Sequence, residues 1–143
     1  MKIETKINIK SNLDTVWKKL VNFENYPNWN LFITKIEGEK KTGATLSVEI
    51  SPPGGQKTIF KPIILKYEEK KELRWVGILL SKHLFSGEHY FQLSLGENGT
   101  TTLIHGENFT GLLAPLIMLL IAKKTEAGFN LMNENLKNAL EPK

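Results

Sequence analysis

"TTLIHGENFTGLLAP", residues 101–115, joins a segment of alternating residues to a long apolar one. Within "TLIHGENF" (102–109), a leucine and a phenylalanine share one parity with His105 and Glu107. A strand points alternate side chains to opposite faces of its sheet. The segment therefore predicts a strand whose apolar face also carries an imidazole and a carboxyl group.

The residues that follow, about 112–140, predict one long C-terminal helix. Its first half is apolar on nearly all sides, and Pro115 lies near its start, where the first turn of a helix tolerates proline. Its second half is amphipathic, which predicts a helix that buries one face. The buried stripe is expected to contain Phe129, Met132, Leu136 and Leu140.

The residues before 101 predict further strands and two short helices. "SNLDTVWKKLV" (11–21) has the apolar spacing of a helix and begins with a capping-box-like Ser11. "NFENYPNWNLF" (22–32) contains Pro27 and four asparagines, which favour a short second helix or helical turn. Alternation and turn residues predict strands at approximately 2–10, 33–39, 44–51, 57–68, 72–80, 85–95 and 101–110.

This order of elements predicts an α+β fold in a single domain, residues 1–143. Sequential strands with short turns pair antiparallel, and about seven of them give a sheet with one apolar face. Only the C-terminal helix is long enough to cover that face. We expect a curved sheet wrapped around this helix, two short helices after the first strand, and space between sheet and helix.

Composition narrows the classes of protein to consider. The net charge is +4, but the lysines are mixed with acids, so a nucleic-acid partner is not expected. The absence of cysteine removes disulfides, thiolate nucleophiles and cysteine-based zinc sites. No segment has the pattern of a signal peptide, and the apolar run is too short to span a bilayer. We therefore expect a cytoplasmic protein without a metal or cofactor.

The strand 85–95 places His89 on its apolar parity, with Phe91, Leu93 and Leu95. The apolar faces of this strand and of 101–110 coincide only if the loop between them has an odd number of residues. A three-residue loop, 97–99, with its glycine left-handed, is a common solution. His89 then faces Glu107, and Phe91 faces His105 on the inner face. A five-residue loop would shift this pairing by one pair and leave these residues diagonal, but His89, His105 and Glu107 would still cluster on the inner face.

Three interpretations of this cluster remain open. His89, His105 and Glu107 form a polar network that satisfies itself in the core, or they line a cavity and bind the polar group of an apolar ligand. Alternatively, they perform acid–base catalysis or bind a metal as two histidines and one carboxylate. Trp75 in "ELRWVGIL" lies on the inward parity of its own strand and is expected beside them.

Four motifs, "YPNWN", "ELRWVG", "LFSGEHYFQL" and "TTLIHGENFTGLLAP", together resemble the SRPBCC superfamily. The resemblance extends over essentially the whole chain. It implies the helix-grip fold of START, polyketide-cyclase and pollen-allergen-like proteins, with a hydrophobic cavity between a seven-stranded sheet and the last helix. Members bind lipids, hormones, polyketides or quinones; some are cyclases, and some regulate chaperones.

The superfamily shares no universal catalytic residue, so the resemblance implies only cavity-lining roles. These fall on Trp29, Phe32, Trp75, Phe91, His105, Glu107 and Phe109. His89 joins them through its expected pairing with Glu107. Leu116 and Leu120, in the apolar run 112–122, complete the expected ligand-binding set.

The apolar run 112–122 has three readings: buried core, one side of the cavity mouth, or a surface that contacts membranes transiently. The expected function is non-enzymatic binding of a small hydrophobic ligand by a monomer or weak homodimer. The alternatives are a cyclase or dehydratase that uses the same cavity and a protein-interaction module of the chaperone-regulator kind.

Overall fold

The computed structural model describes residues 1–141 and has the predicted α+β class. In chain order its elements are β1 (Lys2–Ile9), α1 (Leu13–Val21), the 3₁₀ segment η1 (Phe23–Asn28), β2 (Ile33–Glu37), β3 (Ser47–Ile50), β4 (Thr58–Phe60), β5 (Ile63–Glu68), β6 (Glu72–Leu79), β7 (Phe85–Leu95), the 3₁₀ turn η2 (Glu97–Gly99), β8 (Thr101–Thr110) and α2 (Ala114–Leu140).

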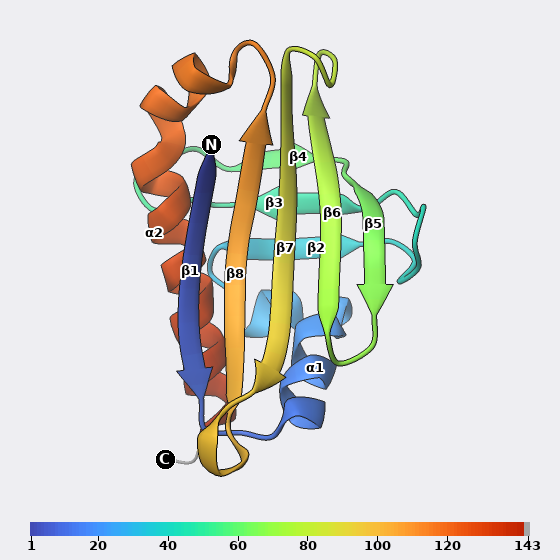
Figure 1. The fold of residues 1–143 in the computed structure, drawn as a ribbon, viewed down its shortest axis with the longest axis vertical. Helices are drawn as coiled ribbons and strands as arrows, with labels where there is room; N and C mark the ends of the chain where they lie inside the picture. Colours follow the sequence, from blue (N-terminus) through green and yellow to red (C-terminus); the bar gives the residue numbers. More distant parts are fainter. Residues whose placement is uncertain (142–143) are drawn as a thin grey trace.

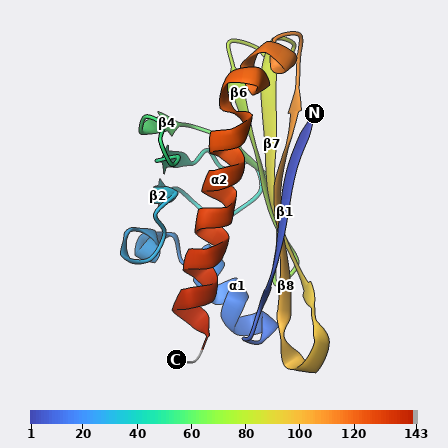
Figure 2. The ribbon, with the colours of Figure 1, turned by 90° about the vertical axis from the view of Figure 1, so that its left-hand side faces the viewer.

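The strands form two antiparallel sheets, whereas one sheet of about seven strands was predicted. The larger sheet has the order β1-β8-β7-β6-β5, and the smaller has the order β2-β3-β4. The strands of the smaller sheet cross behind those of the larger one (Figure 1). Viewed from the side, α2 runs along the larger sheet, and β2 and β4 lie on the other side of the helix (Figure 2). The predicted helix-grip arrangement is therefore confirmed, with eight strands.

The extra strand arises at Pro62, inside the segment 57–68 that was predicted to be one strand. Proline cannot donate to a strand ladder, so pairing stops there and the chain passes from β4 to β5. The Pro62 carbonyl accepts from Leu46 N at 2.8 Å, and Ile64 N donates to the Ala44 carbonyl at 2.9 Å. These bonds join the two sheets at one corner.

Helix α2 buries the predicted stripe against the larger sheet. Phe129, Met132 and Leu136 are fully buried, together with the polar Asn133. Gly128 lets the helix approach Phe32 closely, because a Cβ at this position would overlap the phenyl ring. No helix within residues 1–141 is long and apolar enough to cross a membrane.

Candidate functional site

The site is built on one row of directly paired residues in the larger sheet. Trp75 on β6 pairs with His89 on β7, and His89 pairs with Glu107 on β8. Phe91 on β7 pairs with His105 on β8, two residues away along each strand and on the same face. This is the register expected from the apolar parities and a three-residue loop, and the register is confirmed.

The loop closes as its sequence predicted. Gly96 N donates to the Thr100 carbonyl at 2.9 Å, which leaves Glu97, Asn98 and Gly99 as the turn. Asn98 and Gly99 both adopt positive φ angles, 55° and 75°. These residue types tolerate the left-handed conformation, so the local sequence fixes the register that brings the polar residues together.

A continuous chain of hydrogen bonds links strand, helix and pocket. The Thr5 hydroxyl donates to the His105 carbonyl at 2.8 Å, and Asn133 Nδ2 donates to that hydroxyl at 2.8 Å. Asn133 Oδ1 lies 2.9 Å from His105 Nδ1. His105 Nε2 lies 2.8 Å from His89 Nε2, and His89 Nδ1 lies 3.2 Å from Glu107 Oε1.

When both imidazoles are neutral, the direction of this chain places a proton on Glu107. Asn133 Oδ1 can only accept, so His105 Nδ1 donates to it, and in a neutral imidazole His105 Nε2 must then accept. His89 Nε2 donates to His105, which leaves His89 Nδ1 as an acceptor. Glu107 Oε1 then carries the hydrogen that closes the chain.

Burial produces the protonation states that this chain requires. Loss of hydration lowers the pKa of His89 to about 3 and the pKa of His105 well below its ordinary value. The same cause raises the pKa of Glu107 to about 8. Phe129 covers both imidazoles, with ring centroids 4.9 Å from His89 and 4.3 Å from His105. These shifts favour the neutral forms of the three groups at pH 7, and Glu107 keeps 19% of its side chain exposed beside His89.

Glu107 and His89 form part of the wall of a pocket of about 300 Å³ between the sheets and α2. Most of the wall is apolar. The lining residues are Phe32, Ile33, Ile50, Pro52, Thr58, Phe60, Trp75, Gly77, Ile78, Leu79, Phe85, Gly87, His89, Glu107, Phe109, Ile121, Thr125 and Phe129.

Five of the ten residues expected to bind a ligand line this pocket, and two lie directly behind its wall. The five are Phe32, Trp75, His89, Glu107 and Phe109. Phe91 and His105 have no exposed surface. Phe91 contacts the Trp75 ring at 5.6 Å between centroids, and His105 holds His89 through the bond described above.

The other three expected residues, Trp29, Leu116 and Leu120, lie elsewhere. Trp29 is the C-cap residue of η1 and packs against Tyr26 at 5.0 Å between ring centroids. Leu116 and Leu120 are 60% and 73% exposed on the outer side of α2. The nearly uniform apolar character of this half of the helix gave no sign of which side faces outward.

Three residues of the site were not expected from the sequence. Thr5 pairs directly with His105. It is a polar residue on the parity that otherwise carries the isoleucines of β1, and this was the sign that could have identified it. Asn133 interrupts the apolar stripe of α2 in the same way. Gly87 provides the space for the carboxyl group of Glu107, because a Cβ there would overlap Oε2.

One pocket residue has an unsatisfied polar atom. Trp75 is 1% exposed, and its indole Nε1 has no hydrogen-bond partner within residues 1–141. Its ring stacks on His89 at 5.0 Å between centroids with an angle of 24° between planes. Buried indole N–H groups usually find an acceptor, so an unpaired donor at this position departs from the usual pattern.

No group of three His, Asp or Glu side chains within residues 1–141 is arranged to hold a metal ion. The reason is visible in His89, whose two ring nitrogens contact Glu107 and His105 separately. These contacts lie on different sides of the imidazole, so the three side chains do not converge on a common point. The arrangement fits hydrogen bonding and proton transfer.

A family model described as polyketide cyclase/dehydrase and lipid transport matches residues 1–141. No curated protein matches the sequence. The fold is similar to that of a hypothetical protein from Helicobacter pylori, with a TM-score of 0.79 at 13% identity over 99% of this chain and 88% of that one.

Two further solved structures are similar over nearly the full length of both chains. A START superfamily protein from Mycobacterium smegmatis has a TM-score of 0.72 at 16% identity, covering 97% of this chain and 96% of that one. The Aha1 dimer from Colwellia psychrerythraea has a TM-score of 0.69 at 20% identity, covering 99% and 96%. At these identities the likeness concerns the fold.

Proposed function

The chain belongs to the polyketide cyclase/dehydrase and lipid-transport family, and on that premise we propose that it binds a small hydrophobic molecule in the pocket between the sheets and α2. The ligand class is a lipid, a polyketide or a quinone-like molecule of a few hundred daltons. The observation that carries this proposal is the wall itself, which is apolar except for a few polar groups. Pockets for small molecules combine such walls with few polar anchors.

Glu107 and Trp75 supply the polar anchor in this proposal. Oε1 of Glu107 is engaged by His89, and Oε2 lies against Gly87 in the pocket wall. With the carboxyl group protonated on Oε1, Oε2 is a carbonyl oxygen that accepts a hydrogen bond. The unpartnered Nε1 of Trp75 donates one. A hydroxyl group on the ligand both donates and accepts, so it satisfies the two protein groups together.

A matched pair of ligands tests the anchor. We expect 1-decanol to bind more tightly than decane, with intrinsic tryptophan fluorescence as the readout. Glu107→Leu should weaken decanol about three- to tenfold, the value of one hydrogen bond, and leave decane unchanged. Glu107→Gln should retain decanol, because its amide donates to His89 and its carbonyl replaces Oε2. Equal effects of Glu107→Leu on both ligands would exclude the anchor.

A filled pocket tests the location. Thr125 lines the pocket from α2, whereas Ala127 is exposed two residues further on. Thr125→Phe should abolish binding of both probes, and Ala127→Phe, which adds a ring outside, should not. If both variants bind as the wild type does, the ligand lies elsewhere.

A cyclase or dehydratase in the same pocket is the second candidate, favoured by the pKa of Glu107. A carboxyl group that titrates near pH 8 beside an imidazole can exchange a proton at neutral pH. Glu107→Gln separates the two functions, because an amide retains the hydrogen bonds but cannot transfer the proton. Binding without turnover in this variant, with turnover in the wild type, identifies the enzyme.

A further inference from the structure

One end of the molecule exposes a cluster of leucines. The connection from β6 to β7 and the start of α2 lie together at this end, at the top of Figure 1. We call the cluster the leucine tip. Its members, with their exposed fractions, are Leu79 (52%), Leu80 (80%), Leu112 (79%), Leu116 (60%), Leu119 (81%) and Leu120 (73%).

Backbone hydrogen bonds hold the two segments of the leucine tip together. Leu112 N donates to the His83 carbonyl at 2.9 Å, and Leu113 N donates to the Leu84 carbonyl at 2.8 Å. Leu80 adopts a left-handed conformation with φ of 66°, which is unfavourable for a leucine. The leucines are thus presented on a defined backbone.

The inner side of the helix fixes which leucines face outward. Ala114 and Met118 are buried and pack with Phe109 in a small second core. Residues three and four apart share a face of a helix, so the opposite side of α2 carries Leu116, Leu119 and Leu120. This outer stripe continues one turn later with Lys123 and Lys124.

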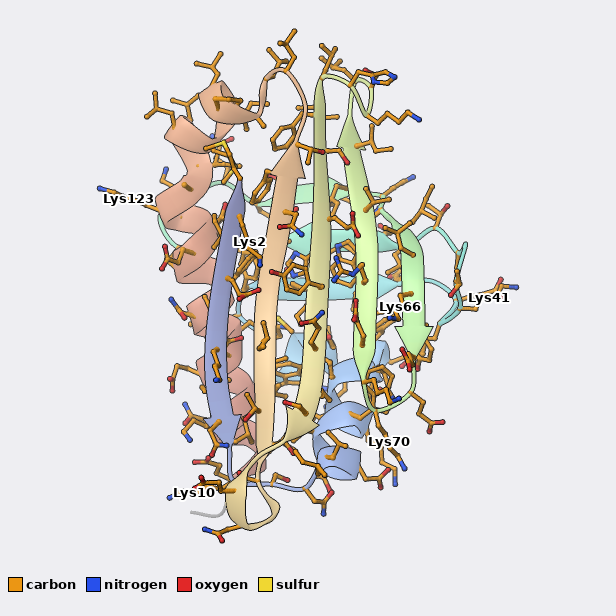
Figure 3. All side chains as sticks on the ribbon, viewed as in Figure 1. Lys2, Lys10, Lys41, Lys66, Lys70 and Lys123 are labelled. Atoms are coloured by element: carbon orange, nitrogen blue, oxygen red, sulfur yellow. The ribbon has the colours of Figure 1, made fainter. Side chains whose placement is uncertain are left out.

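The charged side chains on the segments of the leucine tip are lysines, and the first acids, Glu88 and Glu126, lie just outside these segments. Residues 76–87 and 109–125 contain Lys82, Lys123 and Lys124 and no aspartate or glutamate. All three lysines are exposed, and none forms an ion pair with an acid of residues 1–141. Lys123 projects away from the body of the protein (Figure 3).

The leucine tip is continuous with the rim of the pocket. Leu79 belongs to both, and Ile78 beside it lines the pocket while being 54% exposed. Phe85 and Ile121, from the same two segments, line the pocket further in. An apolar surface therefore runs from the outside of the molecule into the pocket.

We propose that the leucine tip docks on the surface of an anionic lipid bilayer. Exposed leucines enter the boundary between headgroups and acyl chains, and lysines at their border contact anionic headgroups. A symmetric dimer through the same surface would bring two sets of three lysines close together, which is electrostatically unfavourable. Docking on a bilayer goes beyond ligand binding and does not depend on which molecule fills the pocket.

Vesicle co-sedimentation tests the docking. The wild type should bind vesicles of phosphatidylcholine with phosphatidylglycerol, and bind pure phosphatidylcholine at least tenfold more weakly. Leu119→Ser and Leu120→Ser should each reduce the partition coefficient about tenfold, as expected for one exposed side chain that becomes buried. Lys123→Ser should reduce it about fivefold, and high salt should have a similar effect.

The control leucine lies at the opposite end of the molecule. Leu95 is 76% exposed at the end of β7, beside the hairpin at the bottom of Figure 1. Leu95→Ser should leave vesicle binding unchanged, which separates docking from general hydrophobicity. No binding of the wild type to anionic vesicles, or equal losses in Leu95→Ser and Leu119→Ser, would overturn the proposal. So would a dimer in sedimentation velocity that Leu119→Ser dissociates while vesicle binding persists.

Discussion

Glu107 on β8 lies directly opposite His89 on β7, with Oε1 3.2 Å from Nδ1, and the chain of donors behind His89 places the shared proton on the carboxyl group. A protonated carboxyl group presents a hydrogen-bond acceptor to the pocket without a charge. A buried charge would be costly without a partner. The pair therefore allows a polar anchor in an otherwise apolar wall.

The proton on Glu107 gives the stability a distinctive dependence on pH. The unfolded carboxyl group ionises near 4.5, and burial raises the folded pKa to about 8. Unfolding therefore releases a proton between these values, and stability falls as pH rises through this window. The two histidines have the opposite effect on stability. Their pKa values are lowered in the folded protein, so unfolding takes up protons below pH 6.5, and stability falls as pH decreases. We expect maximal stability near pH 6.5.

Glu107→Gln isolates the alkaline side of this profile. Between pH 6.5 and 8 the wild type should lose up to about 2 kcal/mol, since one proton corresponds to about 1.4 kcal/mol per pH unit. The variant should lose less, because its amide does not ionise. Urea unfolding at pH 6.5 and 8.5 provides the comparison, and parallel changes in the two proteins would contradict a protonated Glu107.

Asn133 should be essential to the stability of the network. Asn133→Ala leaves His105 Nδ1 buried without an acceptor and removes the donor to the Thr5 hydroxyl, which keeps its bond to the His105 carbonyl. We expect a loss of about 3 kcal/mol in the free energy of unfolding, since each buried unsatisfied group costs about 1–3 kcal/mol. Asn138→Ala, an exposed change on the same helix, should stay within about 0.5 kcal/mol. Urea titrations that give similar values for both would argue against the network.

Two paired glycines in the pocket wall should respond differently to alanine. Gly87 and Gly77 lie opposite each other on β7 and β6. A Cβ at Gly87 overlaps the carboxyl group of Glu107, whereas one at Gly77 meets the Phe60 ring at 3.5 Å, an ordinary contact. Gly87→Ala should displace the carboxyl group and change the ¹⁵N shift of His89 Nδ1 in NMR spectra. Gly77→Ala should leave this shift unaltered; a change of equal size in both variants would contradict the assignment.

Gly128→Ala should destabilise the protein although alanine is the better helix former. The added methyl group overlaps the Phe32 ring, and overpacking of this kind costs about 1–3 kcal/mol. The gain in helix propensity is about 1 kcal/mol. The neighbouring exposed change Ala127→Gly should cost about 1 kcal/mol by propensity alone. A stabilised Gly128→Ala protein in thermal unfolding would show that α2 can move away from Phe32.

The sequence was sufficient for features that depend on local pattern. The parity of His89 and Glu107 and the turn at 97–99 predicted the register, because one residue of slip would have reversed every side chain. The split at Pro62 was signalled by the proline, but its consequence, a second sheet, depends on where the chain goes next. Local pattern carries no information on that path.

Features that depend on the placement of α2 could not be predicted. Which strand residue meets Asn133 is set by the angle and height of the helix against the sheet, and periodicity is silent on both. The exposure of Leu116 and Leu120 could not be predicted either. This half of the helix is apolar on nearly all sides, so its sequence does not show which side faces outward. Trp29 packs against Tyr26 at the end of η1, outside the pocket lining, and the alternation of its own segment carried no sign of this.

The central claim is that the pocket holds a hydrophobic molecule, and native mass spectrometry of the protein purified from its own cells tests it most directly. Wild type and Ala127→Phe should carry an adduct of a few hundred daltons that solvent extraction releases. Thr125→Phe, whose added ring fills the pocket, should be free of it. The same adduct on Thr125→Phe, or none on the wild type even after incubation with a cell lipid extract, would contradict the account.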